Sequence, residues 1–227
     1  MKYPIILALA LSTSFLAACG GGGGDAPAGP VVSTPSFPLD AAYTKAATTN
    51  RTFNGTAIDG ADTWNLTWST AVAADEVFEG ALSKKASQSL TLKVNGVVGS
   101  VESFDTYFSI NPLTSKGGRY ADGSYAVLTS NTGVLPNAAK VGDAGTLGTL
   151  TTYTSDSKTT VKFTTQSTWT LEADTATTAL GCSNSVIKDA AGTQTSTGSV
   201  CFKIDTSGNI LGMRFTVSIP GKTLVFQ

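Results

Sequence analysis

Apolar and polar residues alternate at every second position through much of the chain after residue 50. Trp64, Leu66 and Trp68, for example, are interleaved with Asn, Thr and Ser. The same period recurs in three later segments, at residues 161–171, 200–204 and 211–219. Successive side chains of a β-strand point to opposite faces, so this pattern predicts strands with one dry face and one wet face.

A tight turn is predicted at Asn95-Gly96, which lies between two such alternating runs. Asn and Gly both tolerate a positive φ, as a two-residue hairpin turn requires. This turn would place Leu90 opposite Val101. The apolar parity changes at Phe104, so we expect a β-bulge near Ser103.

One short helix is predicted before the strands. Asp40 follows Pro38 and is expected to cap a helix that runs through Ala46. No long helical period follows it. The predicted fold class is therefore all-β, either an antiparallel sandwich or a barrel-like meander with one short N-terminal helix. Both architectures have a wet and a dry face, so the pattern leaves the choice open.

The composition excludes several classes of chemistry. The chain contains no histidine, which removes Ser-His-Asp and Cys-His catalysis and His-based zinc sites. Charged residues make up only 14% of the chain and the net charge is -1, so no basic surface for nucleic acid is expected. We expect no enzymatic activity, no cofactor and no metal.

The N-terminus has the layout of an export signal. Lys2 precedes an apolar stretch at residues 4–16, and small residues follow. Leu16-Ala17-Ala18-Cys19 resembles the lipobox of bacterial lipoproteins. The resemblance implies that residues 1–18 are a signal peptide and that Cys19 is lipidated and anchors the chain to a membrane. The alternative is a plain secretory signal with an incidental cysteine.

Residues 19–38 are expected to form a Gly/Pro-rich tether, because the run Gly20 to Gly24 and the prolines after it cannot build a core. Residues 39–227 would then form a single β-rich domain. Gly20, rather than Asp, follows the lipidated position. In lipoproteins of this type, that favours the outer membrane of a Gram-negative cell.

Cys182 and Cys201 remain once Cys19 is acylated, and an even pair in an exported domain indicates a disulfide. The alternative is two buried free thiols. Cys201 alternates with Val200 and Phe202, so its sulfur should lie on the face opposite to theirs. We expect residues 183–199 to form a loop that the disulfide pins to the sheet.

The motif S-x-x-K, which activates a serine in β-lactamase-like enzymes, occurs at residues 155–158 and 185–188. Both copies lie in Thr-rich β segments, where a turn is the favoured interpretation. Residues 205–209 vaguely resemble a calcium loop but lack the later Glu, so a hairpin turn is favoured there too.

Two carboxylate pairs, Glu76 with Glu79 and Asp59 with Asp62, have the residue types of a glycosidase. Solvated surface carboxylates are the favoured interpretation. The three tryptophans, which could line a sugar or lipid site, share strand parity with aliphatic residues and are expected in the core.

Segments 169–175 and 201–209 look like parts of uncharacterised proteobacterial lipoproteins, a resemblance that covers roughly the last 60 residues and implies no activity. The leading hypothesis is therefore a membrane-anchored extracytoplasmic lipoprotein for binding or scaffolding. The alternative is a carrier of a lipid or another apolar ligand.

A change at the lipobox tests the membrane anchor. Cys19→Ala should give a soluble or unprocessed protein, because two or more acyl chains are needed for stable anchoring. Detergent partitioning of the exported protein measures this. A variant that is processed and partitions like the unchanged protein would disprove the lipoprotein hypothesis.

Overall fold

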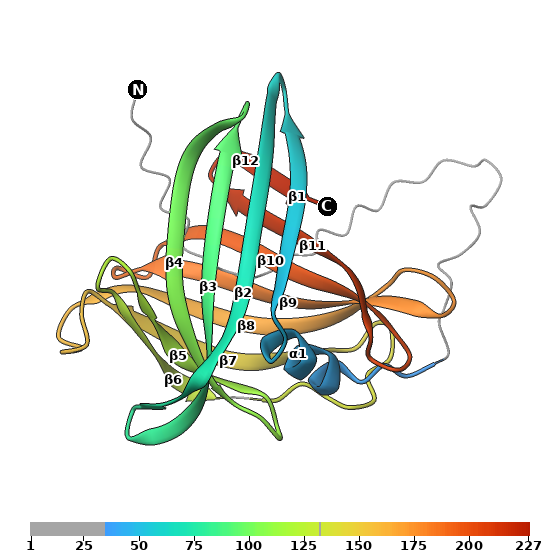
Figure 1. The fold of residues 1–227 in the computed structure, drawn as a ribbon, viewed down its shortest axis with the longest axis horizontal. Helices are drawn as coiled ribbons and strands as arrows, with labels where there is room; N and C mark the ends of the chain where they lie inside the picture. Colours follow the sequence, from blue (N-terminus) through green and yellow to red (C-terminus); the bar gives the residue numbers. More distant parts are fainter. Residues whose placement is uncertain (1–34, 132) are drawn as a thin grey trace.

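The computed structural model describes residues 35–131 and 133–227 (Figure 1). It contains one helix and twelve antiparallel strands, which confirms the predicted fold class. The elements are α1 (Leu39–Ala47), β1 (Arg51–Asp59), β2 (Asp62–Phe78), β3 (Ala81–Val94), β4 (Val97–Ser109), β5 (Thr114–Tyr120), β6 (Tyr125–Asn131), β7 (Ala144–Tyr153), β8 (Val161–Ala173), β9 (Thr178–Asp189), β10 (Gln194–Asp205), β11 (Ile210–Ile219) and β12 (Lys222–Phe226).

The sheet is a nearly closed barrel-like meander, which decides between the two predicted architectures. Each strand pairs with its neighbours in sequence, from β1 to β12. The sheet curls until its two edge strands, β1 and β12, meet. There the Thr56 amide donates a hydrogen bond to the Gln227 carbonyl at 3.3 Å. Figure 1 shows β1–β4 crossing in front of β8–β11 at a steep angle.

The concave face of the sheet holds the main apolar core. Leu66 of β2, Leu90 of β3, Ile204 of β10 and Phe215 of β11 are almost completely buried there. The tryptophans follow the expected assignment: Trp64 and Trp169 belong to this cluster, and Trp68 packs against it. The period-two pattern therefore identified the inward face of these strands.

Helix α1 begins at Leu39, close to the predicted position, but Asp40 does not cap it. No side chain caps this end of the helix. The Asp40 carboxylate instead accepts a hydrogen bond from the Leu113 amide at 2.8 Å. Asp40 lies inside the first turn of the helix rather than before it, so it is free to bind a distant segment.

Tyr43 attaches α1 to the inner face of β9 and β10. Its hydroxyl donates to the Gly181 carbonyl at 2.8 Å and lies 3.2 Å from that of Val200. Its ring meets Phe202 edge to face, with ring centroids 5.0 Å apart. Burial raises the pKa of Tyr43, so the hydroxyl remains a donor. The helix thus fills part of the barrel interior.

The hairpin at Asn95-Gly96 is confirmed, with φ values of 52° and 81°. The expected pairing of Leu90 with Val101 is wrong, because Val101 pairs with Thr91. The register shift lies between Leu92 and Lys93, close to the turn rather than near Ser103. The extra residue opposite this step is Gly99, and a glycine inside a strand commonly marks a bulge.

Residues 183–199 do not form a loop, contrary to expectation. They belong to β9 and β10, which pair along almost their whole length, with Cys182 directly opposite Cys201. Their alternate residues are mostly small or hydroxylated, so the apolar pattern used to predict strands is weak here. Because backbone hydrogen bonds already order this hairpin, reduction of the disulfide should leave it paired.

Truncation of an interior ring tests the packed core. Phe215→Ala should lower the free energy of unfolding by about 3–5 kcal/mol, because the ring is buried and contacts Trp68 and Phe226. Denaturant unfolding measures the loss. The matched control Val225→Ala, on the exposed face of β12, should cost about 0.5 kcal/mol or less. Equal losses would show that the interior is not the dry face.

Candidate functional site

A groove of about 840 Å³ crosses β1 to β5 on the outer face of the sheet. Its lining comprises Asn50, Arg51, Thr52, Ser69, Thr70, Ala71, Ser87, Gln88, Ser89, Ser103, Phe104, Asp105, Arg119, Tyr120 and Ala121. Most of these residues carry a hydroxyl, an amide or a small aliphatic side chain. Its volume lies within the usual range of about 300–1,000 Å³ for ligand sites.

Strand register brings these residues together from distant parts of the sequence. A first outward row crosses paired positions of β1 to β4: Thr52, Ser69, Ser89 and Ser103. A second row crosses β2 to β5: Ala71, Ser87, Asp105 and Arg119. Between the rows, larger side chains such as Gln88 and Phe104 turn inward, so mainly short side chains line the groove.

Charged side chains close one end of the groove. Lys85 Nζ lies 2.8 Å from Glu76 Oε2 and 2.9 Å from Asp105 Oδ2. Arg119 pairs with Glu76 and donates a hydrogen bond to the Tyr107 hydroxyl at 3.0 Å. The two cations and two carboxylates neutralise each other, so this end carries no net charge.

A small aromatic cluster supports these charges on the outer face. The rings of Phe78 and Tyr107 are stacked with centroids 4.2 Å apart, and Tyr125 stacks on Phe78 at 5.2 Å. The Arg119 guanidinium lies over the Tyr107 ring, 5.2 Å from its centroid. The end of the β2–β3 hairpin, which carries Phe78, thus folds back over the outside of the sheet.

The carboxylate pair Glu76 and Glu79 is held by cations. Hydrogen bonds from Lys85 and then Arg119 lower the pKa of Glu76. Lys158, followed by the Tyr125 hydroxyl, lowers the pKa of Glu79. A glycosidase acid needs a raised pKa, so neither group has the property expected of that role.

The second carboxylate pair is also occupied by structural contacts. Asp59 forms an ion pair with Lys222 at 2.6 Å. Asp62 accepts a hydrogen bond from the Asn95 side chain at 2.8 Å. These contacts join the tips of neighbouring hairpins, which gives both carboxylates a structural role.

In neither S-x-x-K motif does the lysine amine form a hydrogen bond with the serine hydroxyl; the Ser155 hydroxyl bonds to that of Ser157. In the β7–β8 turn, Lys158 pairs with Glu79 at 2.8 Å. On β9, Ser185 faces the interior beside Ser167, whereas Lys188 is three positions further along the strand and faces outward. Residues 205–209 form a hairpin turn, as expected. The Asp205 carboxylate accepts hydrogen bonds from the backbone amides of Ser207 and Asn209.

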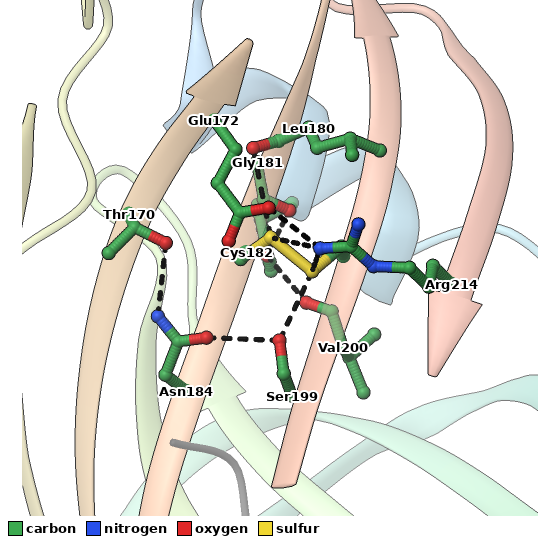
Figure 2. A network of polar contacts seen from close by, with 11 residues as sticks. Thr170, Glu172, Leu180, Gly181, Cys182, Asn184, Ser199, Val200 and Arg214 are labelled. Atoms are coloured by element: carbon green, nitrogen blue, oxygen red, sulfur yellow. Dashed lines mark hydrogen bonds and ion pairs between the residues drawn. A yellow bond between two sulfur atoms is a disulfide. The ribbon is translucent and has the colours of Figure 1, made fainter. Parts of the chain in front are cut away.

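Cys182 and Cys201 form the expected disulfide, on the outer face of β9 and β10. Figure 2 shows it within a polar network, where Arg214 reaches over the sulfurs and donates to Glu172 at 2.7 Å. The closest approach of the Arg214 Nη2 atom to a sulfur is 3.4 Å, at Cys201. The Cys201 sulfur lies on the face of β10 opposite to Val200, as predicted.

Below the disulfide in Figure 2, Asn184 joins the neighbouring strands. Its amide donates to Thr170 at 3.1 Å, and its oxygen accepts from the Ser199 hydroxyl at 3.0 Å. Within the described part of the chain, only Glu172, Cys182 and Cys201 approach closely enough to be considered as a metal-ligand group. Both sulfurs are bonded to each other, so this group offers no thiolate to a metal.

Several expected features lie outside the described residues: the signal peptide at residues 1–18, Cys19, and the tether as far as residue 34. Among the residues that are described, no helix is long and apolar enough to cross a membrane. No protein-family model, curated protein or solved structure matches the chain. The geometry of the molecule is therefore the basis for a functional proposal.

The ion pairs at the charged end of the groove should stabilise the folded protein at neutral pH, and this stabilisation should be lost when acid protonates Glu76. The folded pKa of Glu76 lies below its unfolded value of about 4.3, so its contribution is complete above that pH and disappears as the pH falls through the lowered value. Glu76→Gln should therefore destabilise the protein more at pH 7 than at pH 3. Urea unfolding at both pH values measures this.

The matched control is Asp156→Asn, which neutralises an exposed carboxylate in the β7–β8 turn. It should leave stability unchanged at pH 7. If Glu76→Gln were as harmless as this control, the Glu76, Lys85 and Arg119 network would not contribute to stability.

Proposed function

We propose that this chain is a membrane-anchored extracytoplasmic lipoprotein that binds a neutral, hydroxyl-rich ligand, of which an oligosaccharide is the best-fitting class. The observation that carries the proposal is the groove of about 840 Å³ across β1 to β5, with its rows of short polar side chains. Binding, rather than catalysis, is the activity that these residues support.

The chemistry of the groove favours an uncharged ligand. Serine and threonine hydroxyls can both donate and accept hydrogen bonds, and so can the hydroxyls of a sugar. Two of the three charged lining residues, Asp105 and Arg119, form ion pairs within the protein. The third, Arg51, donates a hydrogen bond to the Ala46 carbonyl and lies over the Phe202 ring. An anion or a cation would have to compete with these contacts, whereas a neutral ligand would not.

We propose also that a lipid anchor holds the domain at a membrane. Lipidation at Cys19 would hold the domain of residues 39–227 at the outer membrane of a Gram-negative cell through the tether at residues 19–38. A flexible segment of that length has a root-mean-square reach of about 25 Å. The domain could therefore reorient while it stays close to the membrane.

The alternative is a carrier of a lipid or another apolar ligand inside the barrel. The interior favours it less, because α1 and rings such as Phe202 and Phe215 already occupy much of the space. The largest interior cavity among those described measures about 260 Å³, slightly below the range of about 300–1,000 Å³ for sites of drug-sized ligands. A carrier of diacyl lipids would need a larger apolar space.

The proposed function is tested by measuring glycan binding to the protein and to a variant in which a bulky side chain fills the groove. The probe is an array of neutral oligosaccharides, applied to the chain from residue 19 onward with Cys19→Ala, which keeps every described residue. Ser89→Trp should abolish binding, because it places an indole in the middle of the groove. Gln166→Trp, on the outward face of β8, adds the same ring away from the groove and should bind normally.

Both variants must retain cooperative unfolding. Absence of binding by the parent protein, or equal binding by Ser89→Trp, would contradict the assignment of the groove. Selective binding of acidic glycans would contradict the argument from neutral chemistry.

A further inference from the structure

A second hollow lies inside the barrel and is separate from the outer groove. It measures about 260 Å³ and is bounded by α1, by the β4–β5 turn and the start of β5, by the β6–β7 loop and by the inner faces of β6 to β9. It occupies the part of the interior that the main apolar core leaves unfilled. Its position on the inner face means that its occupant need not resemble the ligand of the groove.

The walls of this cavity differ in chemistry. Leucines line one side, among them Leu128 of β6 and Leu147 and Leu150 of β7. Hydroxyl side chains of β8 and β9 line the other side, namely Thr165, Ser167, Ser183 and Ser185. The leucine side and the hydroxyl side meet between β7 and β8, where Leu150 pairs with Thr165. The cavity is thus amphipathic.

Some of these hydroxyls are available to a ligand. Ser167 and Ser185 are 3.3 Å apart and satisfy each other. Among the described residues, the hydroxyls of Thr165 and Ser183 form no hydrogen bond, and neither oxygen is fully enclosed, so both can reach a ligand in the cavity. A polar group of a bound molecule could form hydrogen bonds with these two free hydroxyls.

The size and charge of the cavity limit its occupant. No lining residue is ionisable apart from Tyr43, whose hydroxyl is bonded to backbone carbonyls. A charged ligand would therefore lose its hydration without gaining a counter-ion. At about 30 Å³ for each water-sized group, the volume accommodates on the order of nine heavy atoms.

We propose that this cavity is a binding site for one small neutral amphiphile, with an aliphatic body against the leucines and a hydroxyl or ester end against Thr165 and Ser183. Leu128, Leu147 and Leu150 are only partly buried, so the leucine wall has apolar area that such a body would cover. The site is smaller than a diacyl lipid requires, and it is independent of the groove.

Calorimetric titration with 1-octanol tests the proposal, using the chain from residue 19 onward with Cys19→Ala. One molecule should bind to each chain. Octanoate, which has the same length but is ionised at pH 7, should bind at least tenfold more weakly because the cavity offers no cation. Absence of octanol binding up to its solubility limit, or equal binding of octanoate, would overturn the proposal.

Thr165→Val tests the polar wall, because it keeps the branched shape and removes the hydroxyl. It should weaken octanol binding roughly three- to tenfold, the effect of one hydrogen bond. The matched control Thr164→Val makes the same change on the opposite face of β8 and should have no effect. Equal affinities for the two variants would place octanol elsewhere.

Ser183→Leu tests the location independently by filling the cavity, and it should abolish octanol binding while unfolding remains cooperative. Unchanged binding in this variant would overturn the proposal. If this variant does not fold, the comparison of Thr165→Val with Thr164→Val still decides the question. Neither result affects the groove, whose ligand class and variants are different.

Discussion

The meeting of β1 and β12 is the constraint on which the rest of the structure depends. A sheet of twelve strands must bury one face, and it does so here by curling until its edges touch at Thr56 and Gln227. Gly55 permits the close approach, because a Cβ atom there would lie 2.9 Å from the Cβ atom of Phe226. Closure also covers strand edges that would otherwise invite aggregation.

Closure divides the side chains into an inner and an outer set, and each set has its own consequence. The inner set packs around α1 and leaves an amphipathic cavity between α1 and the inner faces of β6 to β9. On the outer face of β1 to β5, two rows of mostly short polar residues cross the strands, and their small size creates the groove. The outer face of β9 and β10 carries the disulfide, which adds a covalent link where Cys182 and Cys201 are already paired through the backbone ladder.

The sequence predicted the class of fold and much of the inner face, because burial leaves a period of two in apolar residues. It could not decide between sandwich and barrel, since that depends on whether β1 reaches β12. It also failed at residues 183–199, where Ser and Thr replace apolar residues on the strands. Gly99 marked the bulge, but the change of parity at Phe104 drew the expectation to Ser103.

The outer groove could not be predicted from the chain alone. Ser69, Ser89 and Ser103 are ordinary outward residues of three different strands, and only the register makes them neighbours. The charged end has the same origin, since Glu76 and Arg119 are 43 positions apart in the sequence. Short hydroxyl residues on the outward positions of successive strands were the available signal, but many solvated sheets share it.

The most direct test of the central claim is to map ligand binding by nuclear magnetic resonance during titration with a neutral oligosaccharide. The account predicts amide shift changes concentrated at Ser69, Ser89 and Ser103, with the interior positions Leu128 and Leu150 unaffected. Shift changes confined to the interior, or none at saturating ligand, would contradict the claim that this barrel binds its ligand on the outside.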